Sequence, residues 1–281
     1  MKLSILTTIT DPEKRQDPYL EAISCYMDFA DEIVIVNGGN KDIYQKIAEG
    51  LNLGDIQQEK IKIIEMSWPA EWSWEELPKH LNAGLATCTG DWIIKLDIDQ
   101  FFHENNIEEI RSRLSRIHKN AAGFQKYSIY PHKKFNQKGN MVIAVRNGQG
   151  IKFGEVHGRY TDLCTPINVL GKNEQGVPTG APVSSERTGV TVWNFDYTFK
   201  TLPKARSEFA RFSRAYKRYF KDAAWGNNDE ESWNKFTTMM KARVAECSYT
   251  LSDYSILPKY IRKRYFNIDP LDFGHSGWGV I

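Results

Sequence analysis

The sequence predicts an α/β fold with a mainly parallel central sheet and a helical C-terminal extension. Over the first hundred residues, apolar β-rich segments alternate with segments of helical periodicity, which is the pattern of βαβ units. Short β-like segments follow at 121–196, and from residue 202 the chain turns helical and basic. We therefore expect an α/β domain over 1–200, with halves at 1–102 and 103–200, and a helical basic extension over 201–281.

The elements of the first half are indicated by their local composition. Strands are expected at 2–10, 31–39, 60–66 and 92–98, and helices at 17–30, 42–51 and 73–90. The first helix has Asp17 as its N-cap and Pro18 at its first helical position. Because ligands of such sheets bind in the crevice at the carboxyl ends of the strands, functional residues are expected where these strands end.

The later elements are less regular. An amphipathic helix is expected at 105–117, where Asn105 and Glu108 have capping-box spacing. The stretch 164–189 is long for a connection, which is typical of lids and of disordered segments. The basic helix 206–221 reads as a packed helix with a solvated cationic face. The alternative is a peripheral contact with an anionic membrane or with a phosphorylated glycolipid acceptor.

Composition and charge exclude several classes of protein. The chain is 41% hydrophobic and 26% charged, which is ordinary for a globular protein and unlike a disordered one. A formal net charge of +2 predicts no general affinity for nucleic acid. Its four cysteines form no C-x-x-C pair, which favours a reducing compartment over a disulfide framework or a zinc knuckle. We therefore expect a cytoplasmic protein without a membrane span or a nucleic-acid partner.

Two carboxylates stand at the end of an apolar run, GDWIIKLDIDQFF at 90–102. In a strand, Asp97 and Asp99 would share a face, because residues two apart point to the same side. Capping of the next helix already falls to Asn105. Hard carboxylate oxygens suit Mg²⁺ or Mn²⁺, so the pair is a candidate metal site. The alternative is an ion pair between Lys95 and Asp97, with Asp99 merely solvated.

The sequence around this pair resembles family 2 glycosyltransferases. In KHLNAGLATCTGDWIIKLDIDQFF (79–102), the motif matches in order and spacing are Asn82, Gly84, Gly90, Asp91, Trp92, Ile93, Asp97 and Asp99. DEIVIVNGGNKD matches another family motif through Glu32, Gly39 and Asp42. VRNGQGIKFGEVHGRY, which carries His157, is similar to bacterial members of the lipopolysaccharide-core type. The resemblance covers roughly residues 1–200.

This resemblance implies the nucleotide-diphospho-sugar transferase fold, GT-A, with helices on both faces of the sheet, 1–102 binding the nucleotide and 103–200 the acceptor. By position, the residues expected at the nucleotide sugar are Thr8, Asn37, Lys79, His80, Asn82 and Asp97. Asp99 would bind the metal ion with Asp97 and His157. Asn37 stands where the family usually has Asp, and Lys79 or His80 replaces the usual Arg. A uridine donor is favoured, because the carbonyl of Asn37 can accept from the imide of uracil.

An inverting transferase also needs a carboxylate base that deprotonates the acceptor hydroxyl. Two candidates stand level. Asp196 lies among aromatic residues in VWNFDY, and Glu155 adjoins His157 in GEVHG.

A dense group of tryptophans, SWPAEWSW at 67–74, has two interpretations. Trp68, Trp72 and Trp74 would form a hydrophobic staple onto the following helix, or they would stack on a sugar.

The function predicted is metal-dependent transfer of a sugar from a nucleotide-diphosphate donor to a glycan or glycolipid, by inversion and with Mn²⁺ or Mg²⁺. One alternative is a non-catalytic nucleotide- or carbohydrate-binding protein. A sugar-1-phosphate nucleotidylyltransferase is a weaker alternative, because TTITDPEKRQD lacks the glycine-rich loop that class needs after its first strand.

Overall fold

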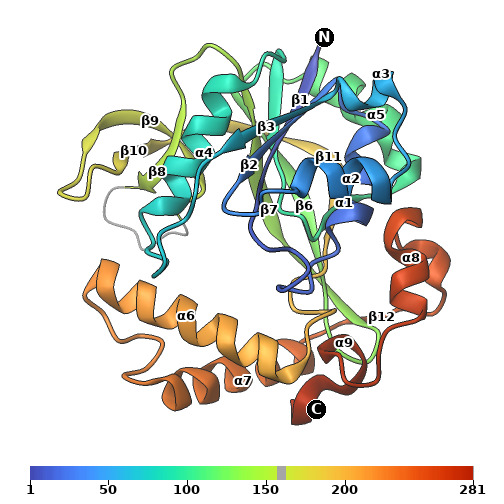
Figure 1. Cartoon of the computed structure of the whole chain (residues 1–281), viewed down its shortest axis with the longest axis vertical. Coiled ribbons are helices and arrows are strands. Elements are labelled where there is room, and N and C mark those ends of the chain that lie inside the picture. The colour runs from blue at the N-terminus through green and yellow to red at the C-terminus, as the bar shows by residue number, and fades with distance from the viewer. Residues whose placement is uncertain (157–162, 281) are drawn as a thin grey trace.

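In the computed structural model, residues 1–156 and 163–280 are described, and a twisted mixed sheet dominates their arrangement (Figure 1). Among these residues the main sheet has nine strands, ordered β3-β2-β1-β4-β7-β6-β11-β5, with β12 paired to β7. Its strands are β1 (Leu3–Ile9), β2 (Glu32–Asn37), β3 (Ile61–Glu65), β4 (Trp92–Lys95), β5 (Gln100–Phe102), β6 (Ala121–Ile129), β7 (Lys134–Arg146), β11 (Ser185–Asn194) and β12 (Tyr249–Thr250).

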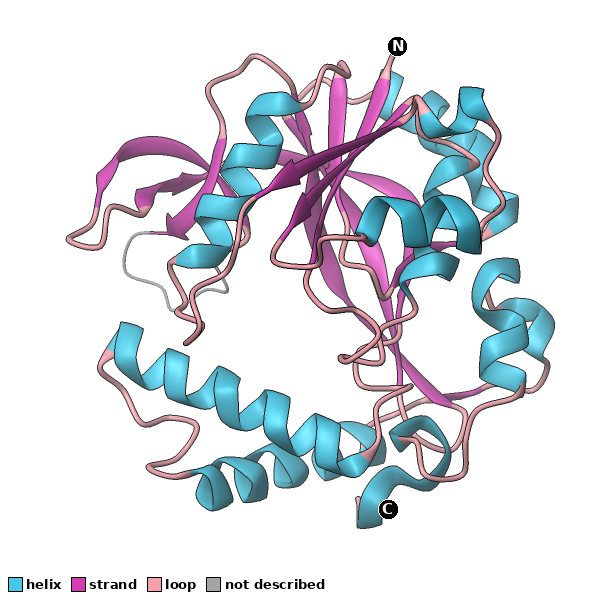
Figure 2. Cartoon of the chain, in the orientation of Figure 1, coloured by secondary structure: helices cyan, strands magenta, loops and turns pink. Residues whose placement is uncertain are grey.

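The first four strands are parallel and are covered on both faces by helices (Figure 2). The helices of this half are α1 (Tyr19–Met27), α2 (Ile43–Gly50), α3 (Asp55–Gln58), α4 (Glu76–Thr87) and α5 (Glu104–Ser115). In β1, Ile5 packs with residues of α1, α2 and α5, while its neighbour Leu6 packs against α4. This two-sided burial explains why these strands are continuously apolar.

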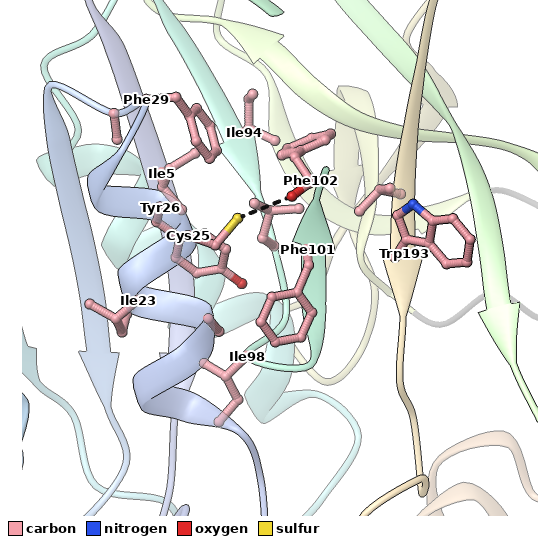
Figure 3. Packing of buried hydrophobic residues seen from close by; sticks show 14 of the residues in the cluster. Ile5, Ile23, Cys25, Tyr26, Phe29, Ile94, Ile98, Phe101, Phe102 and Trp193 are labelled. Atoms are coloured by element: carbon pink, nitrogen blue, oxygen red, sulfur yellow. Dashed lines mark hydrogen bonds between the residues drawn. The ribbon is translucent and has the colours of Figure 1, made fainter. Parts of the chain in front are cut away.

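Aromatic residues fill the core on the α1 side of the sheet. The rings of Phe29 and Phe102 meet edge to face, with centroids 5.4 Å apart. Figure 3 shows this cluster, in which the thiol of Cys25 points to the carbonyl oxygen of Phe102 at 3.6 Å. Cys25 is fully buried, and burial raises the pKa of its thiol. The cysteine therefore packs as a small apolar residue.

The second half of the sheet is mixed. β6 and β7 pair antiparallel, because only a short turn joins them. A parallel pair would need a long crossover connection that returns the chain to the other end of the sheet. β11 then pairs parallel to β6, and β5 pairs antiparallel to β11. The expected parallel arrangement thus holds for the N-terminal half.

A small second sheet occupies much of the predicted lid segment. It comprises β8 (Lys152–Val156), β9 (Thr165–Lys172) and β10 (Pro178–Pro182) and closes on itself. Gly180 permits this closure, because a Cβ there would stand 1.9 Å from the carbonyl oxygen of Asn168. The stretch 164–189 was expected to be a lid or disordered, and that expectation is wrong for most of it. The reason is that its backbone finds partners within a hairpin.

The C-terminal region is helical, with α6 (Leu202–Phe220), α7 (Asp229–Ala245), α8 (Lys259–Phe266) and α9 (Phe273–Ser276), besides 3₁₀ turns at Tyr254–Ile256 and Gly277–Gly279. α6 and α7 lie side by side below the sheet (Figure 1). Phe209 of α6 packs on Phe236 of α7, with ring centroids 4.4 Å apart. Across the described residues, no helix combines the length and apolarity that a membrane crossing demands.

Candidate active site

A cavity of about 340 Å³ lies between the carboxyl ends of the parallel strands and helix α6. It is lined by Thr8, Thr10, Arg15, Asp17, Trp68, Trp72, Leu77, Asp97, Ile98, Asp99, Gln100, Lys126, Asn194, Asp196, Tyr197, Glu208, Arg211 and Phe212. Of the predicted site residues, Thr8, Asp97, Asp99 and Asp196 meet here. The residues contributed by α6 come from the C-terminal extension, so the extension forms one wall of the cavity.

Asp97 and Asp99 lie on a turn rather than on a strand. β4 ends at Lys95, and the chain turns at 98–99 before β5 begins at Gln100. The argument from strand periodicity is therefore wrong, although both side chains do reach the same cavity. The backbone carbonyl of Asp97 accepts hydrogen bonds from the backbone N–H of Gln100 at 2.9 Å and from the Tyr26 hydroxyl at 2.7 Å. A buried tyrosine of α1 thus supports the turn from the core.

Asp97 is paired with a cation. The ammonium of Lys95 donates to both carboxylate oxygens of Asp97 at 2.8 Å, and the side-chain amide of Gln100 donates to Oδ2 of Asp97 at 3.0 Å. Burial by itself would raise the pKa of Asp97, but the charge and hydrogen bonds of Lys95 outweigh it and lower the pKa. Asp97 is therefore held as an ionised acceptor, and the predicted Lys95–Asp97 ion pair is present.

Asp99 is in the opposite situation. Its Oδ1 atom is buried and has no hydrogen-bond partner. Burial, together with the charges of Asp196, Asp97 and Asp17, raises the pKa of Asp99 to about 8. A buried carboxylate oxygen without a donor is costly, and a cation would relieve both the desolvation and the repulsion. No preformed group of three or more His, Cys, Asp or Glu ligands occurs in the described ranges 1–156 and 163–280.

Asp196 follows β11, beside Asn194, and faces the same cavity. Burial raises its pKa, and Lys126 and Lys200 partly oppose that effect. Asn194 in turn accepts from Gln100 at 3.3 Å, which connects this strand end to the turn that carries Asp97 and Asp99. The third carboxylate of the cavity is therefore brought in from nearly one hundred residues away by the pairing of β11 with β5.

Sequence reasoning missed the cations of the cavity. Lys126 of β6 has no hydrogen bond or ion pair within the described residues, yet its charge acts on all three aspartates. The alternation of side chains along a strand could have revealed Lys126, because it places Lys126 on the same face as the buried Phe124 and Ser128. A lysine on the buried face of a strand indicates a nearby anion.

A buried ion network closes one end of the cavity. Lys200 pairs with Asp17 and, at 3.3 Å, with Glu208. Arg15 pairs with the same two carboxylates at 2.9 and 3.5 Å. Burial alone would lower the pKa of Arg15, but Asp17 and Glu208 raise it. The predicted N-cap role of Asp17 is wrong, since α1 begins at Tyr19 with Pro18 at its cap and no side-chain cap bond. Its carboxylate is used by the cations instead.

Trp68 forms another wall and stacks on His80, with ring centroids 3.8 Å apart and planes at 3°. His80 is fully buried, and its two ring nitrogens lie 2.8 Å from the Glu76 carbonyl and 2.7 Å from the Met66 carbonyl. Neither nitrogen faces the cavity, so His80 supports Trp68 rather than meeting a phosphate itself. Trp72 also lines the cavity, whereas Trp74 is buried against Phe212 of α6. The predicted packing onto the following helix is thus made by Trp68, through His80 of α4, and not by Trp74, which packs on α6; stacking on a sugar stays a prediction.

Three other predicted donor-binding residues lie outside the cavity lining. Lys79 is partly exposed and pairs with Glu76 at 2.6 Å. The Asn82 amide bonds to the backbone nitrogen and oxygen of Phe153, both at 2.9 Å, and so joins α4 to β8. Asn37 is fully buried; its amide donates to Glu65 at 2.8 Å and its oxygen accepts from the loop that follows β2. In this structure the three side chains form contacts within a helix, between a helix and a strand, and within a loop, and none of them faces the cavity.

The two candidate bases are separated. Glu155 accepts from the Asn173 amide and from the Tyr219 hydroxyl, both at 2.9 Å, and it does not line the cavity. These bonds link β8 to the far end of α6. His157 lies outside the described residues, so its predicted link to the aspartates stays a prediction.

The chain is similar to several solved structures at low sequence identity. Among solved structures, residues 1–349 of S. aureus TarS are 13% identical, with 87% of this chain and 81% of that chain covered and a TM-score of 0.44. GalNAc-T7 with UDP, GalNAc and Mn²⁺ is 14% identical, with 57% and 27% covered and a TM-score of 0.35. Glucosyl-3-phosphoglycerate synthase from Mycobacterium tuberculosis, in complex with Mn²⁺, UDP and glucosyl-3-phosphoglycerate, is 16% identical, with 46% and 44% covered and a TM-score of 0.29.

No curated protein matches the chain. The family model described as glycosyl transferase family 2 matches residues 20–168, which is more than half of the 281 residues. The matched range contains the parallel strands after β1, the turn with Asp97 and Asp99, and Lys126. With its mixed α/β sheet of GT-A type and its C-terminal helices, the chain belongs to glycosyl transferase family 2.

Proposed function

We propose that the protein transfers a sugar from a nucleotide-diphosphate donor to a glycan or glycolipid acceptor, with a divalent metal and with inversion. The observation that carries the proposal is the convergence of Asp97, Asp99 and Asp196 on one cavity at the carboxyl end of the sheet. Two strand ends far apart in sequence supply these three carboxylates. Aromatic walls and cationic side chains complete a cavity suited to a charged sugar compound.

The residues present fit a divalent ion. Asp99 would hold Mn²⁺ or Mg²⁺ through its buried, unpartnered oxygen. When bound, the ion would supply positive charge next to the departing diphosphate. Asp97, kept ionised by Lys95, would accept hydrogen bonds from ribose or sugar hydroxyls. Lys126 would place a further cation beside the same carboxylates, where the leaving group accumulates negative charge.

For the base we propose Asp196 in preference to Glu155. Asp196 faces the cavity, whereas Glu155 is already committed to Asn173 and Tyr219. A base must come within hydrogen-bond reach of the hydroxyl that it deprotonates. Asp196 would take that proton while the acceptor oxygen attacks from the face opposite the leaving diphosphate, which is a single displacement with inversion.

For the donor we propose a UDP-sugar. Thr8 and Trp68 line the part of the cavity that adjoins the ends of β1 and β3. Asn37 stays a candidate for the base of the nucleotide only if its loop rearranges, because its carbonyl oxygen, which would accept from uracil, already accepts from the backbone N–H of Asn40 at 3.1 Å. Side-by-side calorimetric titration with UDP, GDP and ADP in the presence of Mn²⁺ tests this choice. A clear preference for GDP would contradict it.

We also propose three features of the biological setting on the basis of the sequence. These are an acceptor of the lipopolysaccharide-core type, a cytoplasmic location and a peripheral membrane contact through residues 206–221. Arg206, Arg214 and Arg218 in that range pair with Glu230, Asp229 and Glu71, respectively. A membrane contact would therefore have to compete with existing ion pairs.

A donor-hydrolysis assay across nucleotide sugars, with and without chelator, tests the function. We expect metal-dependent release of the nucleoside diphosphate, lost in chelator and restored by Mn²⁺ or Mg²⁺. Full activity in chelator would remove the metal from the proposal. Tight nucleotide binding without turnover, even with acceptors present, would favour the alternative of a non-catalytic binding protein.

A further inference from the structure

Helix α6 presents one arginine to the cavity that differs from its neighbours. Arg211 lines the cavity and has no hydrogen bond or ion pair within residues 1–156 and 163–280. Its guanidinium carbon lies 6.0 Å from the ring centroid of Trp72, which also lines the cavity. In contrast, Arg206, Arg214 and Arg218 all have carboxylate partners outside the cavity. Arg211 is thus the arginine of this helix whose hydrogen-bonding capacity is unused.

The surroundings of Arg211 leave its charge uncompensated. Asp17 and Glu208 are the acids whose charges act on Arg211, but Asp17 already pairs with Arg15 and Lys200, and Glu208 pairs with both of these and with Lys204 at 3.4 Å. Three cations thus already face these two carboxylates without Arg211. Burial and the charge of Arg15 both lower the pKa of Arg211, which means that its surroundings disfavour one more positive charge. An anion next to Arg211 would relieve that cost.

Arg211 and the aspartates that would hold the metal have different principal charged neighbours, although the ion network that includes Arg15 and Asp17 acts on both. The charges with the greatest influence on Arg211 are Arg15 and Glu208. Among the charges, Lys95 acts most strongly on Asp97, ahead of Lys126 and Arg15, and Asp196 acts most strongly on Asp99, ahead of Asp97 and Asp17. An anion at Arg211 would therefore be a second anionic group in addition to the donor diphosphate.

We propose that Arg211 and Trp72 form a subsite for an anionic group, a phosphate or a carboxylate, carried by the sugar acceptor. The planar guanidinium suits both groups, because it donates two parallel hydrogen bonds to paired oxygens. Trp72 offers an aromatic face for the adjoining sugar ring. The inference rests on the proposed transferase function and names its acceptor class: glycans or glycolipids that bear an acidic group near the accepting hydroxyl.

Calorimetry on the full chain, saturated with UDP and Mn²⁺, tests the subsite. The probes are glucose 6-phosphate and glucuronate, with glucose as the neutral control. The variants are Arg211→Gln and, as a matched control, Arg206→Gln, which removes an exposed arginine of the same helix. We expect the wild type to bind at least one anionic sugar about tenfold more tightly than glucose, and Arg211→Gln to abolish that difference. Arg206→Gln should behave as the wild type.

Arg211→Lys keeps the charge without the paired donors, and it serves if Arg211→Gln does not fold. It should retain part of the preference for the anionic sugar. Equal binding of all three probes by the wild type would overturn the subsite. A fall in UDP affinity of about tenfold in Arg211→Gln would also overturn it, because Arg211 would then serve the donor. Binding of UDP to the wild type, measured before saturation, and release of UDP from a donor sugar report separately on the proposed function.

Discussion

The ammonium of Lys95 lies 2.8 Å from both carboxylate oxygens of Asp97, whereas the buried Oδ1 of Asp99, two residues further on, has no partner. One aspartate of the pair is neutralised by the protein and the other is not. The two positions should therefore respond differently to the same substitution, both in stability and in their dependence on metal.

Asp99→Asn should abolish metal-dependent turnover and leave the metal-free protein at least as stable as the wild type, because burial and the neighbouring aspartates disfavour the ionised form of Asp99 when no metal is bound. Asp97→Asn should lower the free energy of unfolding by about 1–2 kcal/mol, since it removes the ionised carboxylate that Lys95 contacts with two hydrogen bonds; solvent at the exposed side of Asp97 limits the cost. Chemical unfolding of both variants in chelator measures whether each substitution raises or lowers the free energy of unfolding. Clear destabilisation by Asp99→Asn would contradict the proposed role of Asp99.

Asp196→Asn should lower kcat by about 10²–10⁴-fold while UDP affinity stays near that of the wild type, because a general base acts in the chemical step. Glu155→Gln should keep most of kcat and lower the melting temperature, because it disturbs the bonds to Asn173 and Tyr219. Steady-state kinetics and calorimetry on both variants separate the candidates. The reverse pattern would assign the base to Glu155.

Gly38→Ala should weaken UDP binding about tenfold, or ~1.4 kcal/mol. A Cβ at position 38 would stand 1.9 Å from Cδ1 of Trp68 and 2.1 Å from Oγ1 of Thr10, so the indole would have to leave the cavity wall and its stack on His80. Gly139→Ala is the control, because a Cβ there meets nothing within 4 Å. Calorimetry, with tryptophan fluorescence as a monitor of the indole, gives the answer. Unchanged UDP affinity alongside a shifted fluorescence spectrum would remove Trp68 from the donor site.

Glu32 should make stability depend on pH below neutrality. It accepts hydrogen bonds from Ser4 on β1, from Thr89 before β4 and from Lys62 on β3. Burial opposes these bonds, but together they lower its pKa from 4.5 to about 2. Because the folded pKa is lower than the unfolded one, the stabilisation is complete above about pH 4.5 and disappears as the pH falls toward 2.

At neutral pH this linkage is on the order of 3 kcal/mol. Glu32→Gln should therefore be less stable than the wild type at pH 7, with the difference shrinking below pH 4.5. Urea titrations of both proteins from pH 7 to pH 2.5 measure it. A difference that does not change over this range would show that the lost stability comes from packing rather than from ionisation.

The sequence alone determined the α/β class, the parallel strands of the first half and the two aspartates of the cavity. These features depend on local order: apolar runs of strand length, helical periodicity between them, and an ungapped motif that ends in Asp97 and Asp99. The helical periodicity of 206–221 likewise predicted α6, because a helix is closed by contacts three and four residues apart.

The tertiary structure decided which distant residues join that motif. Asp196 reaches the cavity because β11 pairs with β5, while Glu155, equally plausible in sequence, is held by Asn173 and Tyr219. The family resemblance predicts His80 near the phosphates, but its burial between two carbonyl oxygens makes it a support for Trp68. The place of Lys126 and Arg211 in the cavity could not be predicted from the sequence for the same physical reason. Whether a charge is paired depends on contacts between residues far apart in the chain, and no local pattern encodes those contacts.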